Sequence, residues 1–366
     1  MNIQPLFFIN IDLTDHAISQ DHKLFLVFIR EFEDSPHTYR TYGKEVERFL
    51  LWCINNDKHF IKFNRNDVFE YNKFITSSKL LENRCGRPTS KIKKGKINPS
   101  WRPFLSALSE KSAERANLIL KIFFNYLVKS KYINENPFCI SWRKKYIKTH
   151  KLSNVRCLEI SEIKLTLDVL ADSEKNASNS FMYTRGKYII LLLFYTGMRV
   201  SEAAAHKMSD ILLIDNKYYI RITGKGKKIR DIPLPSELLK EIAAFRKKVG
   251  FLTEFPSYNE KTPLIPQKCL KKSIDVRSIH DSLKFSFGLA ANKLEGSDQR
   301  ISSKLRAASA HWLRHTYVTN LLKNGVSPQV VQQNVGHTNI NTTMIYSNLS
   351  QDERHTATQK LSLNMD

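Results

Sequence analysis

Five residues in the second half of the chain are of types that could act on a phosphodiester. They are two arginines, Arg199 and Arg314, two histidines, His311 and His337, and Tyr346. A guanidinium offers planar, paired donors that match phosphate oxygens. Histidine exchanges protons near neutral pH, and a tyrosine hydroxyl can be a covalent nucleophile. Together they would suit attack by a phenol oxygen on a DNA phosphate.

Each residue also has an ordinary structural explanation when it is taken alone. Arg199 is compatible with a surface arginine, and either histidine with a partly buried, hydrogen-bonded one. Tyr346 is compatible with a tyrosine on an amphipathic helix, which for an isolated tyrosine is the more frequent case. The chemical interpretation therefore depends on the elements that must bring the five residues together.

The charge of the chain favours a polyanionic partner. It has 58 Lys and Arg against 35 Asp and Glu in 366 residues, a formal net charge of +23, with a sequence pI near 9.7. Such an excess indicates DNA or RNA first. An anionic membrane surface is disfavoured because no basic amphipathic anchor stands out. The longest apolar run, residues 188–195, is too short to cross a bilayer.

Cysteine usage and the amino terminus indicate a cytoplasmic protein, and a DNA partner would make it nucleoid-associated. The five cysteines are scattered and contain no C-x-x-C pair, which argues against structural zinc or a disulfide framework. The first residues carry Asp12 and Asp15 and no positive n-region, so they do not read as a secretory signal. No cofactor or metal motif is recognised.

The first half is expected to be a helical block. Residues 1–18 read as a short arm, and residues 19–140 as a helical domain. Its helices are predicted over 22–55 with a break at Ser35-Pro-His, over 66–81, and onward from Ser109. A Gly-, Pro- and Lys-rich stretch at about 83–100 is interpreted as an exposed loop or insertion. Its DNA-binding candidates are Arg87, Lys91, Lys93, Lys94 and Lys96.

A basic run over residues 141–157 is the best candidate for a linker. It supplies four further DNA-binding candidates, Arg143, Lys144, Lys145 and Lys148. A solvated surface strand or helix is the ordinary reading of such a run. Between two basic domains, a strap along DNA is at least as well supported.

The second half, residues 158–350, is predicted to be mostly helical with one β-hairpin. Helices are expected over 160–172, 180–196, 236–249, 275–293 and 304–324. Alternating apolar residues around Gly-Lys-Gly predict a hairpin over 218–234 with Lys225 at its tip, where a merely solvated lysine is the alternative. Gly325 is expected to stop a helix, and Ser327-Pro328 to restart one through Val335. A last helix from about 341 would carry Tyr346.

The second half resembles the tyrosine recombinase (phage integrase) family, from about residue 158 to 350. The resemblance rests on five segments: TGMRVSE (196–202), TGKGKKIRDIPL (223–234), HWLRH (311–315), GHTNINTT (336–343) and MIYSN (344–348). All six positions of the family's active set are filled, by Arg199, Lys225, His311, Arg314, His337 and Tyr346. The joint match is far more specific than any single segment.

The resemblance implies that Tyr346 attacks a scissile phosphodiester, forming a 3′-phosphotyrosine and releasing a 5′-hydroxyl. Arg199 and Arg314 would neutralise charge on the non-bridging oxygens, which fits their chemistry. His311 would accept the tyrosine proton or bind a phosphate oxygen, and His337 would donate to one. Lys225 would protonate the leaving oxygen. Glu202 is compatible both with orienting a catalytic side chain and with an ordinary surface position.

The resemblance also implies an architecture and partners. We expect a mainly α protein, a helical core-binding (SAM-like) domain followed by a mostly helical catalytic domain with a small β-hairpin or sheet. Double-stranded DNA with specific recombination sites is the expected partner. A homotetramer would bind it and exchange strands through a Holliday junction, and accessory DNA-bending proteins could take part. The tail, residues 351–366, would dock onto a neighbouring protomer or be disordered.

Alternatives of other classes stay open on the sequence. A type IB topoisomerase uses similar chemistry but relaxes supercoils as a monomer. A non-catalytic DNA-binding protein of the same fold is the second, although the complete active set argues against it. A telomere resolvase lacks specific support. Integration or excision of a mobile element is the expected programme, and chromosome-dimer resolution uses the same pair of domains.

Overall fold

The computed structural model describes residues 16–81, 85–86, 91–93, 96–98, 100–139, 156–175, 180–224, 226 and 228–336. The chain divides into two compact units, Met1–Thr149 and His150–Asp366. The division falls within the basic run that the sequence suggests as a linker. Each unit has its own hydrophobic core, and they are described separately.

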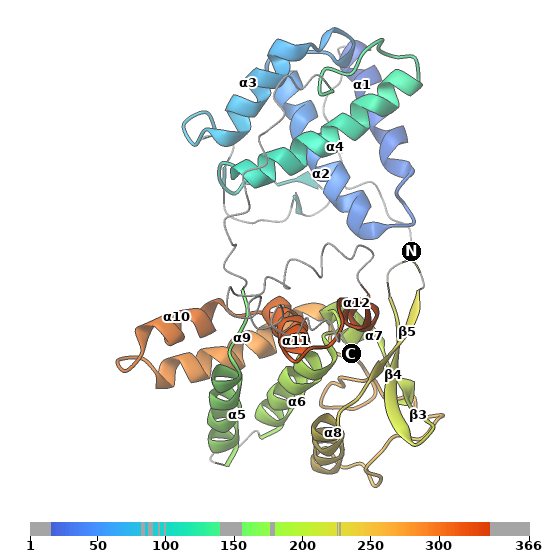
Figure 1. The fold of residues 1–366 in the computed structure, drawn as a ribbon. Coiled ribbons are helices and arrows are strands. Elements are labelled where there is room, and N and C mark those ends of the chain that lie inside the picture. Colours follow the sequence, from blue (N-terminus) through green and yellow to red (C-terminus); the bar gives the residue numbers. More distant parts are fainter. Residues whose placement is uncertain are drawn as a thin grey trace, which may run out of the picture. The chain divides into compact units, whose positions relative to one another are not determined.

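The described part of unit 1 is a bundle of four α-helices (Figure 1). They are α1 (His16–Arg30), α2 (Pro36–Asn55), α3 (Arg65–Thr76) and α4 (Glu110–Lys129), with a 3-10 turn η1 (Phe60–Lys62). Proline at the first turn of α2 explains the predicted break, because it lacks an amide donor. The helix predicted over 66–81 starts under a capping box of Asn64 and Asp67 and ends earlier, at Thr76.

Aromatic side chains fill the core of unit 1. Phe28 and Phe49 each contact several other rings, and Phe49 meets Phe63, Tyr71 and Phe124 edge-on with centroids 4.9 to 5.6 Å apart. Such edge-to-face pairs stabilise a core beyond the area they bury. Helices α1, α2 and α4, which carry Phe28, Phe49 and Phe124, pack against one another.

The described part of the basic stretch at 83–100 contains a short strand pair where the sequence predicts a loop. Strands β1 (Ile92–Lys93) and β2 (Lys96–Ile97) pair antiparallel, and the Asn98 amide donates to the Lys91 carbonyl at 2.8 Å. Outside this hairpin, the backbones of Cys85 and Phe104 form an isolated parallel β-bridge. These backbone bonds supply a local fold that a composition rich in Lys and Gly does not signal.

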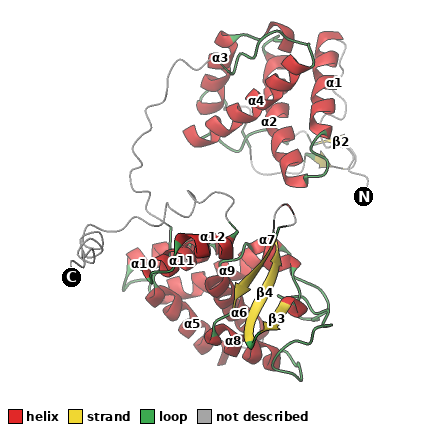
Figure 2. Cartoon of the chain, turned by 45° about the vertical axis from the view of Figure 1, so that its right-hand side comes forward, coloured by secondary structure: helices red, strands yellow, loops and turns green. Residues whose placement is uncertain are grey.

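Unit 2 is a helical domain with one small sheet (Figure 2). Helix α6 (Ser180–Thr196) packs against α5 (Ile160–Lys175), α8 (Ser236–Lys248), α9 (Val276–Lys293) and α11 (Ala310–Lys323). Its residues 188–195 are an unbroken apolar run, as suits a helix with neighbours on several sides. The sheet has the order β3-β4-β5 and is antiparallel throughout. The sheet confirms the predicted hairpin and adds β3, which the sequence analysis missed.

The three strands are β3 (Ile211–Ile214), β4 (Lys217–Thr223) and β5 (Ile229–Pro233), preceded by the 3-10 turn η3 (Met208–Asp210). Ile220 of β4 lies opposite both Ile211 and Ile232, and all three are buried. The hairpin between β4 and β5 therefore projects from a sheet that is anchored in the core.

The predicted helix over 304–324 is wrong as a single element. The chain forms α10 (Gln299–Ala307) and α11, separated by Ala308 and Ser309 in extended conformations. The residues around 308–309 are all compatible with a helix, so their local helix preferences do not indicate the break. The break redirects α11 so that Arg314, on its second turn, reaches the Gly197 carbonyl.

Helix α12 (Pro328–Val335) confirms the predicted restart. Gly325 has φ +80°, the Ser327 hydroxyl accepts from the Val330 amide, and Pro328 occupies the first turn. The helix ends at Gly336, whose φ is +65°. The predicted helix with Tyr346 and the tail 351–366 lie outside the described residues, as do most of the arm and linker.

No helix among the residues that the structure describes is both long and apolar enough to cross a membrane.

Candidate active site

Three of the six predicted active-set residues are described, and the structure brings them together. Arg199 caps the start of α7 (Val200–Ala205), while His311 and Arg314 lie on the first turns of α11. Lys225, His337 and Tyr346 lie outside the described residues.

Arg314 is fixed by backbone carbonyls on two other elements. Its guanidinium donates to the Gly197 carbonyl at 2.6 Å and to the Val335 carbonyl at 2.7 Å, and the residue is only 4% exposed. Gly197 follows α6, and Val335 ends α12. Arg314 thus joins the segment that carries Arg199 to the one that leads into His337.

Arg199 lies beside Arg314 at the same helix end. Its guanidinium donates to the Gly336 carbonyl at 3.3 Å, next in sequence to the carbonyl that Arg314 binds. The carboxyl end of a helix carries partial negative charge, which favours cations there. The side chain of Arg199 stays 42% exposed. Two guanidiniums, one of them partly exposed, therefore bind successive carbonyls.

Gly197 makes this arrangement sterically feasible. It has φ +58°, and a Cβ there would lie 2.3 Å from the Tyr317 ring on α11. The Tyr317 hydroxyl in turn accepts a hydrogen bond from the Asn334 amide on α12 at 3.1 Å. The close approach of α11 to the end of α6 requires glycine.

The electrostatics of the site favour a neutral His311. Partial burial, followed by the charges of Arg314 and Arg199, holds the pKa of His311 below its ordinary value. The ring of His315, one turn on, has its centroid 4.1 Å from that of His311. Burial, with His311 and Arg314, lowers the pKa of His315 to about 4. Near pH 7 His311 is thus able to accept a proton.

Glu202 is part of the site rather than a surface residue. Its carboxylate accepts from the Arg199 amide at 2.8 Å and from the Arg199 guanidinium at 3.1 Å. Arg230 of β5 binds both carboxylate oxygens, at 3.1 and 2.7 Å. Burial alone would raise the pKa of Glu202, but hydrogen bonds from Arg230 and Arg199 keep it below its ordinary value.

Arg230 is a site residue that sequence reasoning missed. Its signal was its place in the segment 223–234, on the second strand of the hairpin that carries Lys225, but an arginine on a strand is unremarkable by itself. His206, also missed, joins α7 to β4. Its Nε2 accepts from the Thr223 amide at 2.9 Å, and its Nδ1 lies 2.8 Å from the Glu202 carbonyl.

The predicted DNA-binding lysines are mostly outside the described residues. Of those whose side chains are described, Lys91 forms an ion pair with Glu47 and lies over the Trp101 ring at 5.2 Å. Its ammonium is therefore engaged within unit 1. Lys93 and Lys96 lie on β1 and β2. Arg87, Lys94 and the candidates at 143–148 have no described position.

A basic groove between α2 and α4 was not predicted. It encloses about 560 Å³, and its basic lining residues are His37, Arg40, Lys44, Arg48 and Arg115. Glu45, which also lines it, is bound to Arg48 at 3.0 Å. Burial and the charge of Arg48 lower the pKa of Lys44, as expected where cations crowd. The helical spacing of His37, Arg40 and Lys44 was the available signal.

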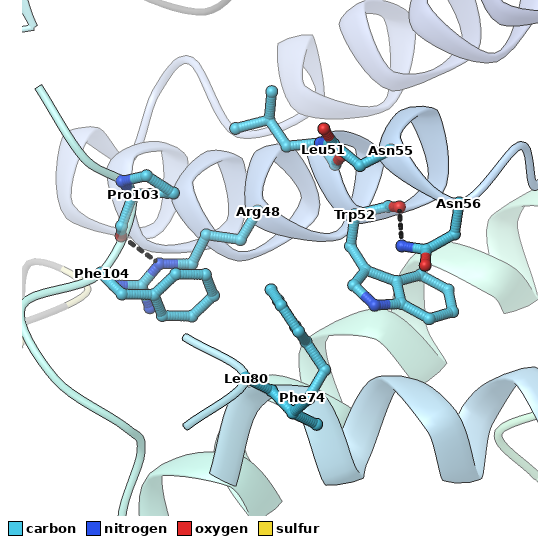
Figure 3. Close-up of a pocket in the computed structure, with 9 residues that line it drawn as sticks. All are labelled: Arg48, Leu51, Trp52, Asn55, Asn56, Phe74, Leu80, Pro103 and Phe104. Atoms are coloured by element: carbon cyan, nitrogen blue, oxygen red, sulfur yellow. Dashed lines mark hydrogen bonds between the residues drawn. The ribbon is translucent and has the colours of Figure 1, made fainter. Parts of the chain in front are cut away.

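A neighbouring pocket of about 300 Å³ is mainly structural (Figure 3). Trp52, Phe74 and Phe104 form its apolar walls. Arg48 donates to the Pro103 carbonyl at 2.8 Å and stacks on Phe104, so it ties α2 to the loop before α4. None of the active-set residues lines it.

Among the described residues, no group of three or more His, Cys, Asp or Glu side chains is arranged to hold a metal ion. The positive charge at the described site comes from Arg199, Arg230 and Arg314 of the chain itself.

Comparison with known proteins agrees with this geometry. Residues 164–353 match the phage integrase family. A tyrosine recombinase of Pseudothermotoga lettingae is 27% identical over 348 residues, which cover 94% of this chain and 98% of that protein. Tyrosine recombinase XerD of Staphylococcus epidermidis is 30% identical over 247 residues, covering 67% and 74%.

Solved structures show the same fold. The integrase of transposon Tn1549 (residues 82–397), in complex with circular intermediate DNA, superposes with a TM-score of 0.62 at 16% identity, covering 95% of this chain and all of that one. The XerH recombinase bound to its difH substrate gives 0.58 at 19% identity, covering 94% and 84%.

Proposed function

Because the chain belongs to the phage integrase family and is a tyrosine recombinase that cleaves and rejoins DNA, we propose that it integrates or excises a mobile element at specific sites. The reaction would pass through a 3′-phosphotyrosine and exchange strands between two duplexes through a Holliday junction. A homotetramer on DNA, with or without DNA-bending accessory proteins, is the assembly that such an exchange requires.

One observation supports the proposed chemistry above the others. Arg199 and Arg314 bind adjacent carbonyls at the end of α12, and their positive charges help to lower the pKa of His311. A pentavalent phosphorane carries extra negative charge on its non-bridging oxygens. Preorganised guanidiniums stabilise such charge without reorganisation, which is commonly the largest contribution to catalysis.

The proposed cleavage step assigns one role to each residue. The Tyr346 oxygen forms a bond to the scissile phosphorus while the bond to the 5′-oxygen breaks. His311 accepts the tyrosine proton, and Lys225 gives a proton to the departing oxygen. His337 donates to a non-bridging oxygen. Ligation reverses these steps, with a partner strand's 5′-hydroxyl displacing Tyr346, so no external energy source is needed.

We further propose that the groove between α2 and α4 holds the DNA backbone. Phosphate contacts from Lys and Arg supply most sequence-independent affinity. Arg40, Lys44 and Arg115 are exposed along this groove. The Lys91 ion pair with Glu47 makes that lysine a weaker candidate.

Trapping on genomic DNA tests the proposed function. The full chain is incubated with sheared genomic DNA of its source organism, adducts are captured by denaturation in detergent, and the bound DNA is sequenced. Capture of one short sequence family, joined to protein through its 3′-phosphate, is the expected result. No adduct above that of a Tyr346→Phe control would contradict it.

The location of the captured sites separates two programmes. Sites that flank the gene are expected for a mobile-element enzyme. Chromosome-dimer resolution is the second candidate, and it predicts one chromosomal site far from the gene. Relaxation of supercoiled plasmid that lacks the captured site would instead indicate a topoisomerase.

A further inference from the structure

We propose that Arg230 is a positioning residue of the active site, which holds the segments before Lys225 and His337 against the carboxylate that orients Arg199. The inference rests on the proposed function, but one of its tests needs no DNA. Arg230 lies on β5, and its side chain is 12% exposed, whereas the Glu202 side chain beside it is 6% exposed.

Three elements meet at this one guanidinium. Nη1 and Nη2 bind the two oxygens of Glu202 on α7, at 3.1 and 2.7 Å. Nε donates to the Asn334 carbonyl on α12 at 2.9 Å. Only an arginine can bridge a carboxylate and a carbonyl with such fixed geometry, because a lysine is a single point of charge.

The backbone packs against the guanidinium at two glycines. A Cβ on Gly224 would lie 3.1 Å from Nη1, and one on Gly336 would lie 3.2 Å from the same nitrogen. Gly224 immediately precedes Lys225, and Gly336 immediately precedes His337. Both positions before an active-set residue thus touch one side chain, and neither leaves room for a larger residue without a shift.

The chemical consequence passes through Glu202. Its carboxylate is shared between Arg230 and Arg199, which also binds the neighbouring Gly336 carbonyl. Without Arg230, the freed carboxylate would bind Arg199 more fully and draw that guanidinium away from a phosphate. The Asn334 carbonyl would also lose its arginine donor, whereas the carbonyls of Val335 and Gly336 would keep theirs.

Hydrogen exchange of the full chain tests the positioning role without DNA. The variant is Arg230→Met, and the matched control is Arg221→Met, which removes the exposed pair of Arg221 with Asp231 from the same hairpin. Faster exchange at peptides covering 223–229 and 333–337 is expected for Arg230→Met, with α6 unchanged as a measure of global folding. Faster exchange in the hairpin peptide alone, as in the control, would overturn the proposal.

The rate of adduct formation on sheared genomic DNA is the second test. A fall of about 10- to 100-fold for Arg230→Met is expected, with unchanged affinity in a binding assay, because misplacing groups by about an ångström slows chemistry by such factors. Arg230→Lys should recover only part, and Arg221→Met should match wild type. Full recovery by lysine, or equal loss in the control, would refute the positioning role. Failure of wild type to form adducts would instead contradict the proposed function, and the exchange result would still decide the role of Arg230.

Discussion

The guanidinium of Arg314 is held by the chain's own carbonyls, so its chemical and structural contributions are linked. The side chain of Arg199, by contrast, is 42% exposed and contacts Glu202 and one carbonyl. This difference could not be read from the sequence, where both are arginines in short motifs. The sequence was enough to identify both arginines as phosphate-binding candidates, because that role follows from the chemistry of the guanidinium. Their burial depends on packing between distant segments.

Replacing Arg314 with lysine should reduce both catalysis and stability. Loss of one preorganised donor slows cleavage by about 100- to 1,000-fold. The two carbonyls left without partners should lower the free energy of unfolding by about 2 kcal/mol. Single-turnover cleavage and denaturant unfolding measure the two effects. In the control, Arg199→Lys, cleavage should fall while stability changes little; equal stability loss in both would argue against this assignment.

The lowered pKa of His315 predicts acid-sensitive stability. Its ordinary value is 6.5 and its folded value about 4, so the unfolded state binds more protons between these values. The contribution is complete above pH 6.5 and is lost as the pH falls through 4, by at most about 3 kcal/mol. Thermal unfolding of His315→Gln between pH 7 and 4.5 should show a shallower decline than wild type. An identical decline would mean that other groups dominate.

At the scale of elements, the end of α12 is the point of assembly. Arginines from β5, α11 and the start of α7 each bind one of its last carbonyls. Helix α12 itself was predictable from Gly325, Ser327 and Pro328. Its partners were not, because each comes from a remote segment. The division of 304–324 into α10 and α11 was equally hidden, since tertiary packing overrides the helical preference of Ala308.

Gly197→Ala should disturb this assembly from a distance. The new methyl group would clash with the Tyr317 ring, and the backbone has a left-handed conformation. We expect a loss of about 2 kcal/mol or more in the free energy of unfolding, from strain and overpacking. Gly288→Ala is the matched control, because a Cβ on that α9 glycine meets nothing within 4 Å. A neutral effect at Gly197 would show that α11 can move away freely.

At the scale of the whole molecule, the positive charge predicted a polyanion but not the face that binds it. The sequence directed attention to the runs at 83–100 and 141–157, where basic residues are adjacent. The described groove instead combines residues from α2 and α4 that only folding brings together. The mainly helical class and the small sheet were predictable because hydrophobic periodicity is local.

Charge reversal in the groove should weaken DNA binding in a salt-dependent way. For Arg40→Glu combined with Lys44→Glu, the slope of log affinity against log salt should become shallower by about 2, because each phosphate that a side chain neutralises contributes about 0.9 to that slope. Titration of a labelled duplex at several salt concentrations measures it. Lys73→Glu, on α3 outside the groove, is the control. A change about half as large in the control, which reverses one charge instead of two, would show that only net charge matters.

The most direct measurement of the central claim is covalent capture of genomic DNA by wild type and by Tyr346→Phe, run side by side with a binding assay. The phenylalanine variant is expected to bind the same DNA with similar affinity but to form no adduct. Peptide mapping of the wild-type adduct is expected to place the DNA on Tyr346. Adducts that persist in the variant, or that map to another residue, would contradict the account.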